Sequence, residues 1–142
     1  MLADLDLDKL STEEKAELLE LLEAKAKLKA ENKLASYAPY PKQIEFHTAG
    51  GTEGVRERLL KAGNQQGKTL SAGAEAAMHL TGRYPDWWQG KRWVRGVKGW
   101  AAGLTALATR DNAQNILLGP PGSWGTGWIP ADAIESIARA TH

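Results

Sequence analysis

The chain has 142 residues, with 18 basic and 17 acidic side chains and a formal net charge of +1. This length predicts one domain at most, and the absence of cysteine excludes disulfide bonds and thiolate metal sites. No apolar run approaches the roughly 20 residues that a membrane span needs. The N-terminus is acidic (Asp4, Asp6, Asp8), which does not predict a signal peptide. We therefore expect a soluble cytoplasmic protein with no membrane partner.

Charge is unevenly distributed along the chain. Residues 1–35 hold six lysines against nine acidic side chains, a net charge of −3. The remaining residues hold twelve basic against eight acidic side chains, a net charge of +4. An anionic partner is therefore expected to bind the second part.

A long helix is expected near the N-terminus. Ser11 and Glu14 have the spacing of a capping box, in which each side chain pairs with the other's backbone N–H. From residue 12 to about residue 36 there is no Gly or Pro, and Ala, Leu, Glu and Lys dominate. We expect a solvated helix with one packed stripe. A coiled-coil or partner-binding arm is the alternative, although the heptads are not sustained.

The middle of the chain predicts a strand, a loop and a helix in succession. After the prolines at 39 and 41 come a short segment at 42–47 and a flexible glycine-rich stretch at 50–54. An apolar run predicts a first strand at 58–62, and a glycine loop at 62–69 precedes a helix that extends to Leu80. Gly82 is a natural helix stop in the left-handed conformation.

Four further elements are expected in the last third. The near-continuous apolar run at 97–104 predicts a parallel strand buried on both faces. Residues 109–118 predict a helix, and residues 119–130, rich in Gly and Pro, predict a loop. Pro130 can open a last short helix to about residue 140.

The loop at 62–69 has the composition of a phosphate-binding loop. Gly63 and Gly67 allow tight turns, so that backbone N–H groups and the helix N-terminus point at an anion. Lys68 can reach the β- and γ-phosphates of a nucleotide, and the Thr69 hydroxyl can coordinate Mg²⁺. The usual first glycine is Ala62 here, and a chance glycine turn is the alternative. The expected nucleotide-binding residues are Gly63, Asn64, Gln65, Gln66, Gly67, Lys68 and Thr69.

An adenine contact is expected upstream of this loop. Gln43 carries a donor and an acceptor that suit the N6 and N7 edge of adenine. Tyr40 supplies an aromatic ring beside it, as in many ATP-driven nucleic-acid motors. The alternative is that Gln43 is an ordinary surface residue next to packed aromatic rings.

Two other clusters have simpler structural interpretations. One segment holds four tryptophans among five Arg and Lys residues: Trp87, Trp88, Trp93 and Trp100. Aromatic rings mixed with cations suit nucleic-acid binding. Packing of the rings under loops is favoured instead, because a single element cannot place them all on one face. Glu75 and His79 are spaced i, i+4 and are expected to form a surface pair. The sequence supports neither a metal ligand set nor a Ser-His-Asp arrangement.

The acidic residue that ATP hydrolysis requires is missing from the pattern. A hydrolysing ATPase of this class needs an apolar strand that ends in Asp, which holds Mg²⁺, and an acidic residue that activates water. The apolar runs here end in Gly119-Pro120 and in Thr105. No catalytic residue can therefore be assigned in this chain.

Taken together, these motifs resemble the large subunit of tailed-phage terminase, a DNA-packaging ATPase. The resemblance is carried, in order, by residues 39–47, 62–69, 79–88, 100–103, 109–112 and 117–119. It implies ATP and Mg²⁺ as cofactors, and double-stranded phage DNA, the terminase small subunit, the portal protein and further copies of the chain as partners, in the host cytoplasm. Some family members have an Arg in the phosphate loop where this chain has Asn64, so the source of an arginine finger is open.

The predicted fold is α/β: an incomplete parallel sheet of the P-loop NTPase (RecA-like/ASCE) type, preceded by a long N-terminal helix. Residues 1–36 would form a helical segment and residues 37–142 the N-terminal part of a P-loop ATPase domain without a nuclease domain. The leading function is ATP binding within a viral packaging motor. The alternatives are a truncated inactive fragment, a nucleic-acid-binding module that uses the Trp/Arg segment, and a small P-loop kinase.

Overall fold

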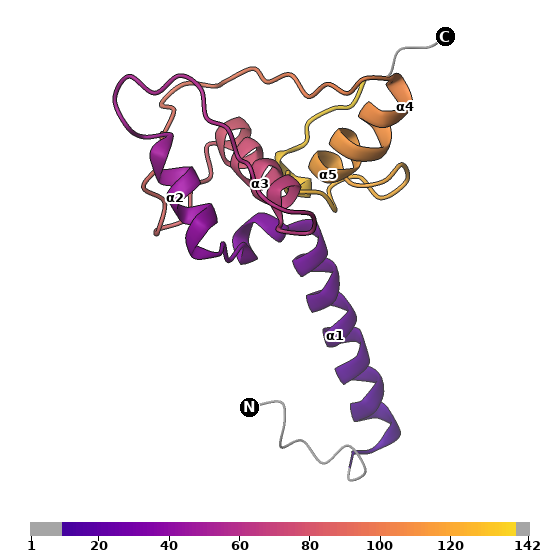
Figure 1. Ribbon diagram of the computed structural model, residues 1–142. Helices are drawn as coiled ribbons and strands as arrows, with labels where there is room; N and C mark the ends of the chain where they lie inside the picture. Colours follow the sequence, from indigo (N-terminus) through magenta and orange to yellow (C-terminus); the bar gives the residue numbers. More distant parts are fainter. Residues whose placement is uncertain (1–9, 139–142) are drawn as a thin grey trace.

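The computed structural model describes residues 10–138 and consists of helices joined by long irregular connections (Figure 1). Its elements, in chain order, are α1 (Thr12–Glu31), η2 (Lys33–Ser36), α2 (Pro41–Ala49), α3 (Lys68–Thr81), α4 (Ala106–Ala108), η3 (Thr109–Gln114), α5 (Asn115–Leu118) and η4 (Ala131–Ala133). No helix within this part of the chain is both long enough and apolar enough to span a membrane.

The first helix begins where the capping box predicts. The Ser11 hydroxyl accepts from the Glu14 N–H at 3.2 Å, and the Glu14 carboxylate accepts from the Ser11 N–H at 2.8 Å. These hydrogen bonds lower the pKa of Glu14. α1 ends at Glu31, earlier than expected, because Asn32 caps the separate turn η2 by accepting from the Ala35 N–H. No residue of α1 is buried, and the helix extends away from the other elements (Figure 1).

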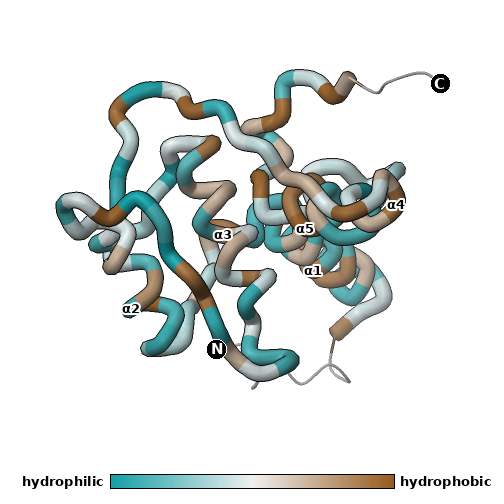
Figure 2. The backbone as a smooth tube through the Cα atoms, turned by 45° about the horizontal axis from the view of Figure 1, so that its top comes forward, coloured by the Kyte–Doolittle hydropathy of each residue, from teal (hydrophilic) through white to brown (hydrophobic). Residues whose placement is uncertain are grey.

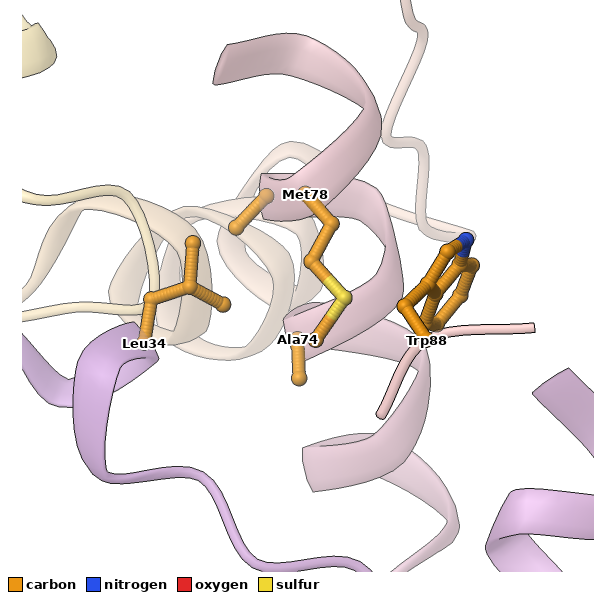
Figure 3. Close-up of a cluster of buried hydrophobic side chains, with 5 residues drawn as sticks. Leu34, Ala74, Met78 and Trp88 are labelled. Atoms are coloured by element: carbon orange, nitrogen blue, oxygen red, sulfur yellow. The ribbon is translucent and has the colours of Figure 1, made fainter. Parts of the chain in front are cut away.

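The hydrophobic core is built on α3. Ala74, Ala77 and Met78 recur at helical spacing and are fully buried, and Leu34 and Trp88 complete the cluster. Figure 3 shows the Met78 side chain between Leu34 on one side and Trp88 on the other. Small side chains on α3 allow its neighbours to approach closely. The helix ends at Gly82 with φ of 70°, which confirms the predicted stop.

A second helical run, residues 106–118, packs beside α3. It comprises α4, η3 and α5, and it begins three residues before the predicted helix at 109–118. The Thr105 hydroxyl caps it by accepting from the Ala108 N–H at 3.1 Å. A Cβ added at Gly73 would lie 2.7 Å from side-chain carbons of Ile116 and Trp128, so glycine is what permits this close approach. The predicted loop at 119–130 is confirmed.

The predicted sheet is wrong. Residues 58–62 and 97–104 form no strand, and none occurs anywhere in residues 10–138. The run at 97–104 was expected to be buried on both faces, yet Trp100 is 95% exposed and Leu104 is also exposed. The physical reason is that strand N–H and C=O groups need a neighbouring strand, and neither run has one here. The described chain is therefore not an α/β P-loop sheet but a helical structure with irregular connections.

Two smaller predictions also need correction. Residues 41–49, expected only as a short segment, form the helix α2, which Pro41 opens from its first position. The last predicted helix, 130–140, is reduced to the 3-10 turn η4 within the described residues, and its positions 139 and 140 lie outside them. Hydrophobic residues lie along the connections as well as on the helices (Figure 2), and several large ones are exposed.

Candidate functional site

The predicted phosphate loop lies directly before α3. Gly67 is the N-cap residue of α3 and has φ of 71°, a conformation that suits glycine, and Gln65 also has a positive φ of 59°. The first N–H groups of a helix have no partner within the helix, so they are available to an anion. A cavity of about 260 Å³ opens here, lined by Gln65, Gln66, Gly67, Lys68, Thr69 and Leu70.

The Lys68 side chain folds back and contacts the start of this loop. Its ammonium donates to the carbonyl oxygens of Ala62 at 2.8 Å and Gly63 at 2.6 Å. These two bonds close the loop on itself and keep a positive charge beside the α3 N-terminus. An anion bound there would meet the ammonium and the helix N-terminus together.

Gln43 ties α2 to the same loop. Its side-chain oxygen accepts from the Tyr40 N–H at 2.9 Å, and its amide nitrogen donates to the Gly67 carbonyl at 3.3 Å. Gln43 is buried, whereas the Tyr40 side chain is largely exposed. The structure thus brings Gln43 into contact with the loop, with its amide engaged in contacts within the protein, and Tyr40 contacts Gln43 through its backbone N–H.

Behind the loop lies a buried polar network centred on Glu75 of α3, which is 6% exposed. One carboxylate oxygen lies 2.6 Å from His47 Nδ1, and the other lies 3.3 Å from His79 Nε2. Arg58, in the segment before the loop, forms an ion pair with both oxygens. The network therefore joins α2, α3 and the chain segment that leads into the loop.

The ionised form of Glu75 is strongly stabilised by this network. Burial raises the pKa of Glu75, but the contacts with His47, His79 and Arg58 outweigh burial and hold that pKa far below its ordinary value. Arg58 donates in addition to the Phe46 carbonyl at 2.7 Å, and its guanidinium lies 4.5 Å from the Phe46 ring centroid. Burial also raises the pKa of Tyr37, whose hydroxyl lies 3.0 Å from His47 Nε2.

Ser71, His47 and Glu75 are connected in the order of a catalytic triad. The Ser71 hydroxyl lies 3.2 Å from His47 Nε2, and His47 Nδ1 contacts Glu75. All three side chains are buried, with Ser71 fully so. A nucleophile must reach its substrate, so this arrangement is structural rather than catalytic.

Sequence reasoning missed this network. Glu75 and His79 were expected to be a surface pair, and that expectation is wrong because Glu75 is buried. Ser71, Glu75 and His79 recur every four residues on α3, which places three polar residues on one helical face and is the signal that could have been used. No group in the described residues has the arrangement of a metal site.

The tryptophan segment divides into packed and exposed members. Trp88 is buried and donates its ring N–H to the Lys91 carbonyl at 3.1 Å, and Trp87 packs against the core, as the packing interpretation expected. Trp93 is 50% exposed and Trp100 is 95% exposed. The Lys91 ammonium lies 5.4 Å from the Trp93 ring centroid.

Comparison with known proteins tests the predicted family resemblance. The chain is 42% identical, over 152 aligned positions, to the terminase large subunit of Salmonella phage P22. The chain is a relative of the terminase large subunit. The match covers 96% of this chain and 30% of the relative, so the predicted resemblance to an N-terminal portion of this family is confirmed. No family model and no solved structure matches the chain.

Proposed function

We propose that this chain is the ATP-binding part of a viral terminase large subunit, a motor that packages double-stranded DNA into the procapsid. The relative's name supports the family, and the loop before α3 supports the nucleotide site. Because the chain spans only 30% of that relative's length, the activity and partners of the whole protein are part of the proposal. Those partners are phage DNA, the small subunit, the portal protein and other copies, in the host cytoplasm.

The observation that carries the proposal is the position of Lys68. Its ammonium, the Gly67 turn and the α3 N-terminus surround one cavity. In the proposed complex the ammonium leaves the loop carbonyls for the β- and γ-phosphates, and Thr69, which lines the same cavity, offers its hydroxyl to Mg²⁺. The Gln43 amide, which contacts Gly67, and the exposed Tyr40 ring three residues before it in the chain are the residues proposed to bind the adenine base.

Lys68→Ala tests the proposal directly. Charge-assisted contacts of this kind are worth about 1.5–3 kcal/mol, so ATP affinity should fall at least about tenfold. Isothermal titration calorimetry with Mg²⁺-ATP measures the change. Lys61→Ala is the matched control, because Lys61 is an exposed lysine one residue before the loop and should leave affinity unchanged. An equal loss of ATP affinity in Lys68→Ala and Lys61→Ala, or no loss in either variant, would contradict the assignment of Lys68 to nucleotide binding.

A second candidate function is nucleic-acid binding through the exposed tryptophans. It is favoured by the high exposure of Trp100 and by the cation at Trp93, since exposed rings and cations together form stacking platforms. Trp100→Ala should then weaken binding of a fluorescent DNA oligonucleotide, whereas ATP affinity should not change. A chain that binds neither ATP nor DNA would favour the inactive fragment. Phosphate transfer to a small acceptor would favour the kinase.

A further inference from the structure

A second polar cavity, of about 680 Å³, opens between the glycine-rich turn after α2 (residues 50–54) and the start of the tryptophan segment at 91–93. Its volume lies in the usual range of small-molecule sites. It shares no lining residue with the cavity at 65–70. His79, on its wall, is eleven positions after Lys68 on α3, or about 16 Å along the helix. The two cavities are therefore separate.

Close backbone packing holds the two walls of this cavity together. In the glycine-rich turn, the Gly51 N–H donates to the Thr48 carbonyl at 2.9 Å. A Cβ added at Gly51 would lie 2.9 Å from the Gln89 carbonyl oxygen, so glycine permits the turn to approach the opposite wall. That wall continues into Lys91 and Trp93, whose side chains line the cavity. The cavity is thus bounded on both sides by backbone that packs together.

Two cations of this cavity lack an ion-pair partner within the described part of the chain. Three cations line the cavity, Arg56, Arg58 and Lys91, against the single carboxylate of Glu53. Arg58 is already paired with the buried Glu75. Arg56 and Lys91 are exposed and form no ion pair with any described residue. The cavity therefore favours an anionic ligand.

An aromatic ring lies beside these cations. Trp93 is half-exposed, and the Lys91 ammonium lies 5.4 Å from its ring centroid. The His79 ring packs edge-on against Trp93, with the two centroids 6.3 Å apart, and helps to hold the ring in place. A planar base can stack on an exposed tryptophan, and a phosphate attached to that base can form charge-assisted contacts with the neighbouring cations.

We propose that this cavity is a second anion site, which takes a nucleoside monophosphate. The base stacks on Trp93, and the phosphate contacts Arg56 and Lys91. A phosphate monoester carries a charge of about −1.5 to −2 at pH 7, which two unpaired cations match. A triphosphate would bring excess negative charge close to Glu53. The inference goes beyond the proposed ATP site, because the loop at Lys68 takes no part in it.

Binding of thymidine 5′-monophosphate is the first measurement, because thymine lacks the adenine edge that Gln43 is proposed to read. Isothermal titration calorimetry at low salt uses the Lys68→Ala chain, in which the proposed ATP site is impaired. Thymidine and inorganic phosphate, each alone, should bind more weakly than the monophosphate, and thymidine triphosphate should bind no more tightly. No binding of the monophosphate, or equally tight binding of inorganic phosphate, would overturn the proposal.

Variants of the lining residues test the assignment. Arg56→Ala with Lys91→Ala should weaken monophosphate binding at least about tenfold. Lys61→Ala with Arg95→Ala is the matched control, because it removes two exposed cations of the same two segments outside the cavity. Glu53→Gln removes a like charge and should tighten binding by roughly two- to fivefold, a gain that a purely structural role would not produce.

Far-ultraviolet circular dichroism establishes that each variant retains its helices. Unchanged affinity in the Arg56/Lys91 variant, an equal loss in the control, or no gain in Glu53→Gln contradicts the site. A thymidine oligonucleotide without a terminal phosphate is the last probe. If it binds through Arg56 and Lys91 while the monophosphate does not bind, the cavity belongs to a nucleic-acid surface and the proposal is wrong.

Discussion

At the residue scale, Glu75 shows how one buried charge can organise several elements. A carboxylate this deeply buried stays ionised only when hydrogen-bond donors or cations lie close to it. Here α2, α3 and the segment before the loop supply these partners. The same contacts join the middle of α3 to Arg58, which lies in the chain segment that enters the loop. The network therefore supports the geometry of the proposed nucleotide site without touching a nucleotide.

Glu75→Gln should destabilise the chain. The substitution keeps the size of the side chain but leaves Arg58 without its counter-charge, at a cost of roughly 3 kcal/mol, the low end for a buried pair because Arg58 is partly exposed. Urea denaturation at pH 7 measures the loss. Arg83→Gln is the control, because its ion pair with Asp132 is exposed and should contribute little.

The same substitution should change the response to acid. The folded pKa of Glu75 is lowered, so its contribution to stability is complete above the unfolded pKa, about 4.3, and is lost as the pH falls from there toward the folded pKa. Stability of the parent chain should therefore decline below about pH 4.3, and Glu75→Gln should show a shallower decline. Parallel profiles of parent and variant would show that other carboxylates account for the acid sensitivity.

Gln43 is the second residue whose role can be separated by experiment. If its amide reads the adenine edge, Gln43→Ala should reduce the preference for ATP over GTP and leave phosphate affinity mostly intact. If the amide serves only to hold Gly67, both nucleotides should weaken equally, because the loop itself is disturbed. Competition binding of the two nucleotides to parent and variant, in the intact motor, distinguishes these outcomes.

At the element scale, sequence predicted the parts that local chemistry determines. The capping box at Ser11, the helix after Lys68 and its stop at Gly82 depend on neighbours within a few residues, and all three are confirmed. The strands at 58–62 and 97–104 were wrong because a strand depends on a distant partner that no local pattern reveals. Glu75 was misplaced for a related reason, since the buried face of α3 is set by tertiary packing.

The dependence on α3 leads to a prediction for its packing. Met78 is fully buried between Leu34 and Trp88, so Met78→Ala leaves a cavity and should cost about 2–5 kcal/mol. In a chain with a core this small, that is a large share of the total stability. Leu70→Ala, at an exposed position of the same helix, should change the urea midpoint little. Similar midpoints for both variants would show that the core does not centre on α3.

At the scale of the whole molecule, the proposed nucleotide loop has no acid suited to hydrolysis placed beside it among the described residues. Phosphoryl transfer depends on Mg²⁺ held by a carboxylate and on an oriented water. Asp111 is engaged by Arg110 at 2.7 Å, and Asp86 lies in the cavity lined by Tyr37 and Trp87, away from the residues around Lys68. Glu75, whose partners hold its pKa well below the ordinary value, is already engaged by Arg58 and two histidines.

We therefore expect the purified 142-residue chain to bind Mg²⁺-ATP and not to turn it over. The rate of phosphate release from ATP should equal the rate in buffer alone. ATP hydrolysis should appear only when the remaining part of a terminase ATPase is joined to the chain or added to it. A coupled phosphate assay on the parent chain, with Lys68→Ala as the control, measures this. Steady phosphate release that disappears in Lys68→Ala would mean that a carboxylate of this chain, from the same copy or from a second copy, completes the site.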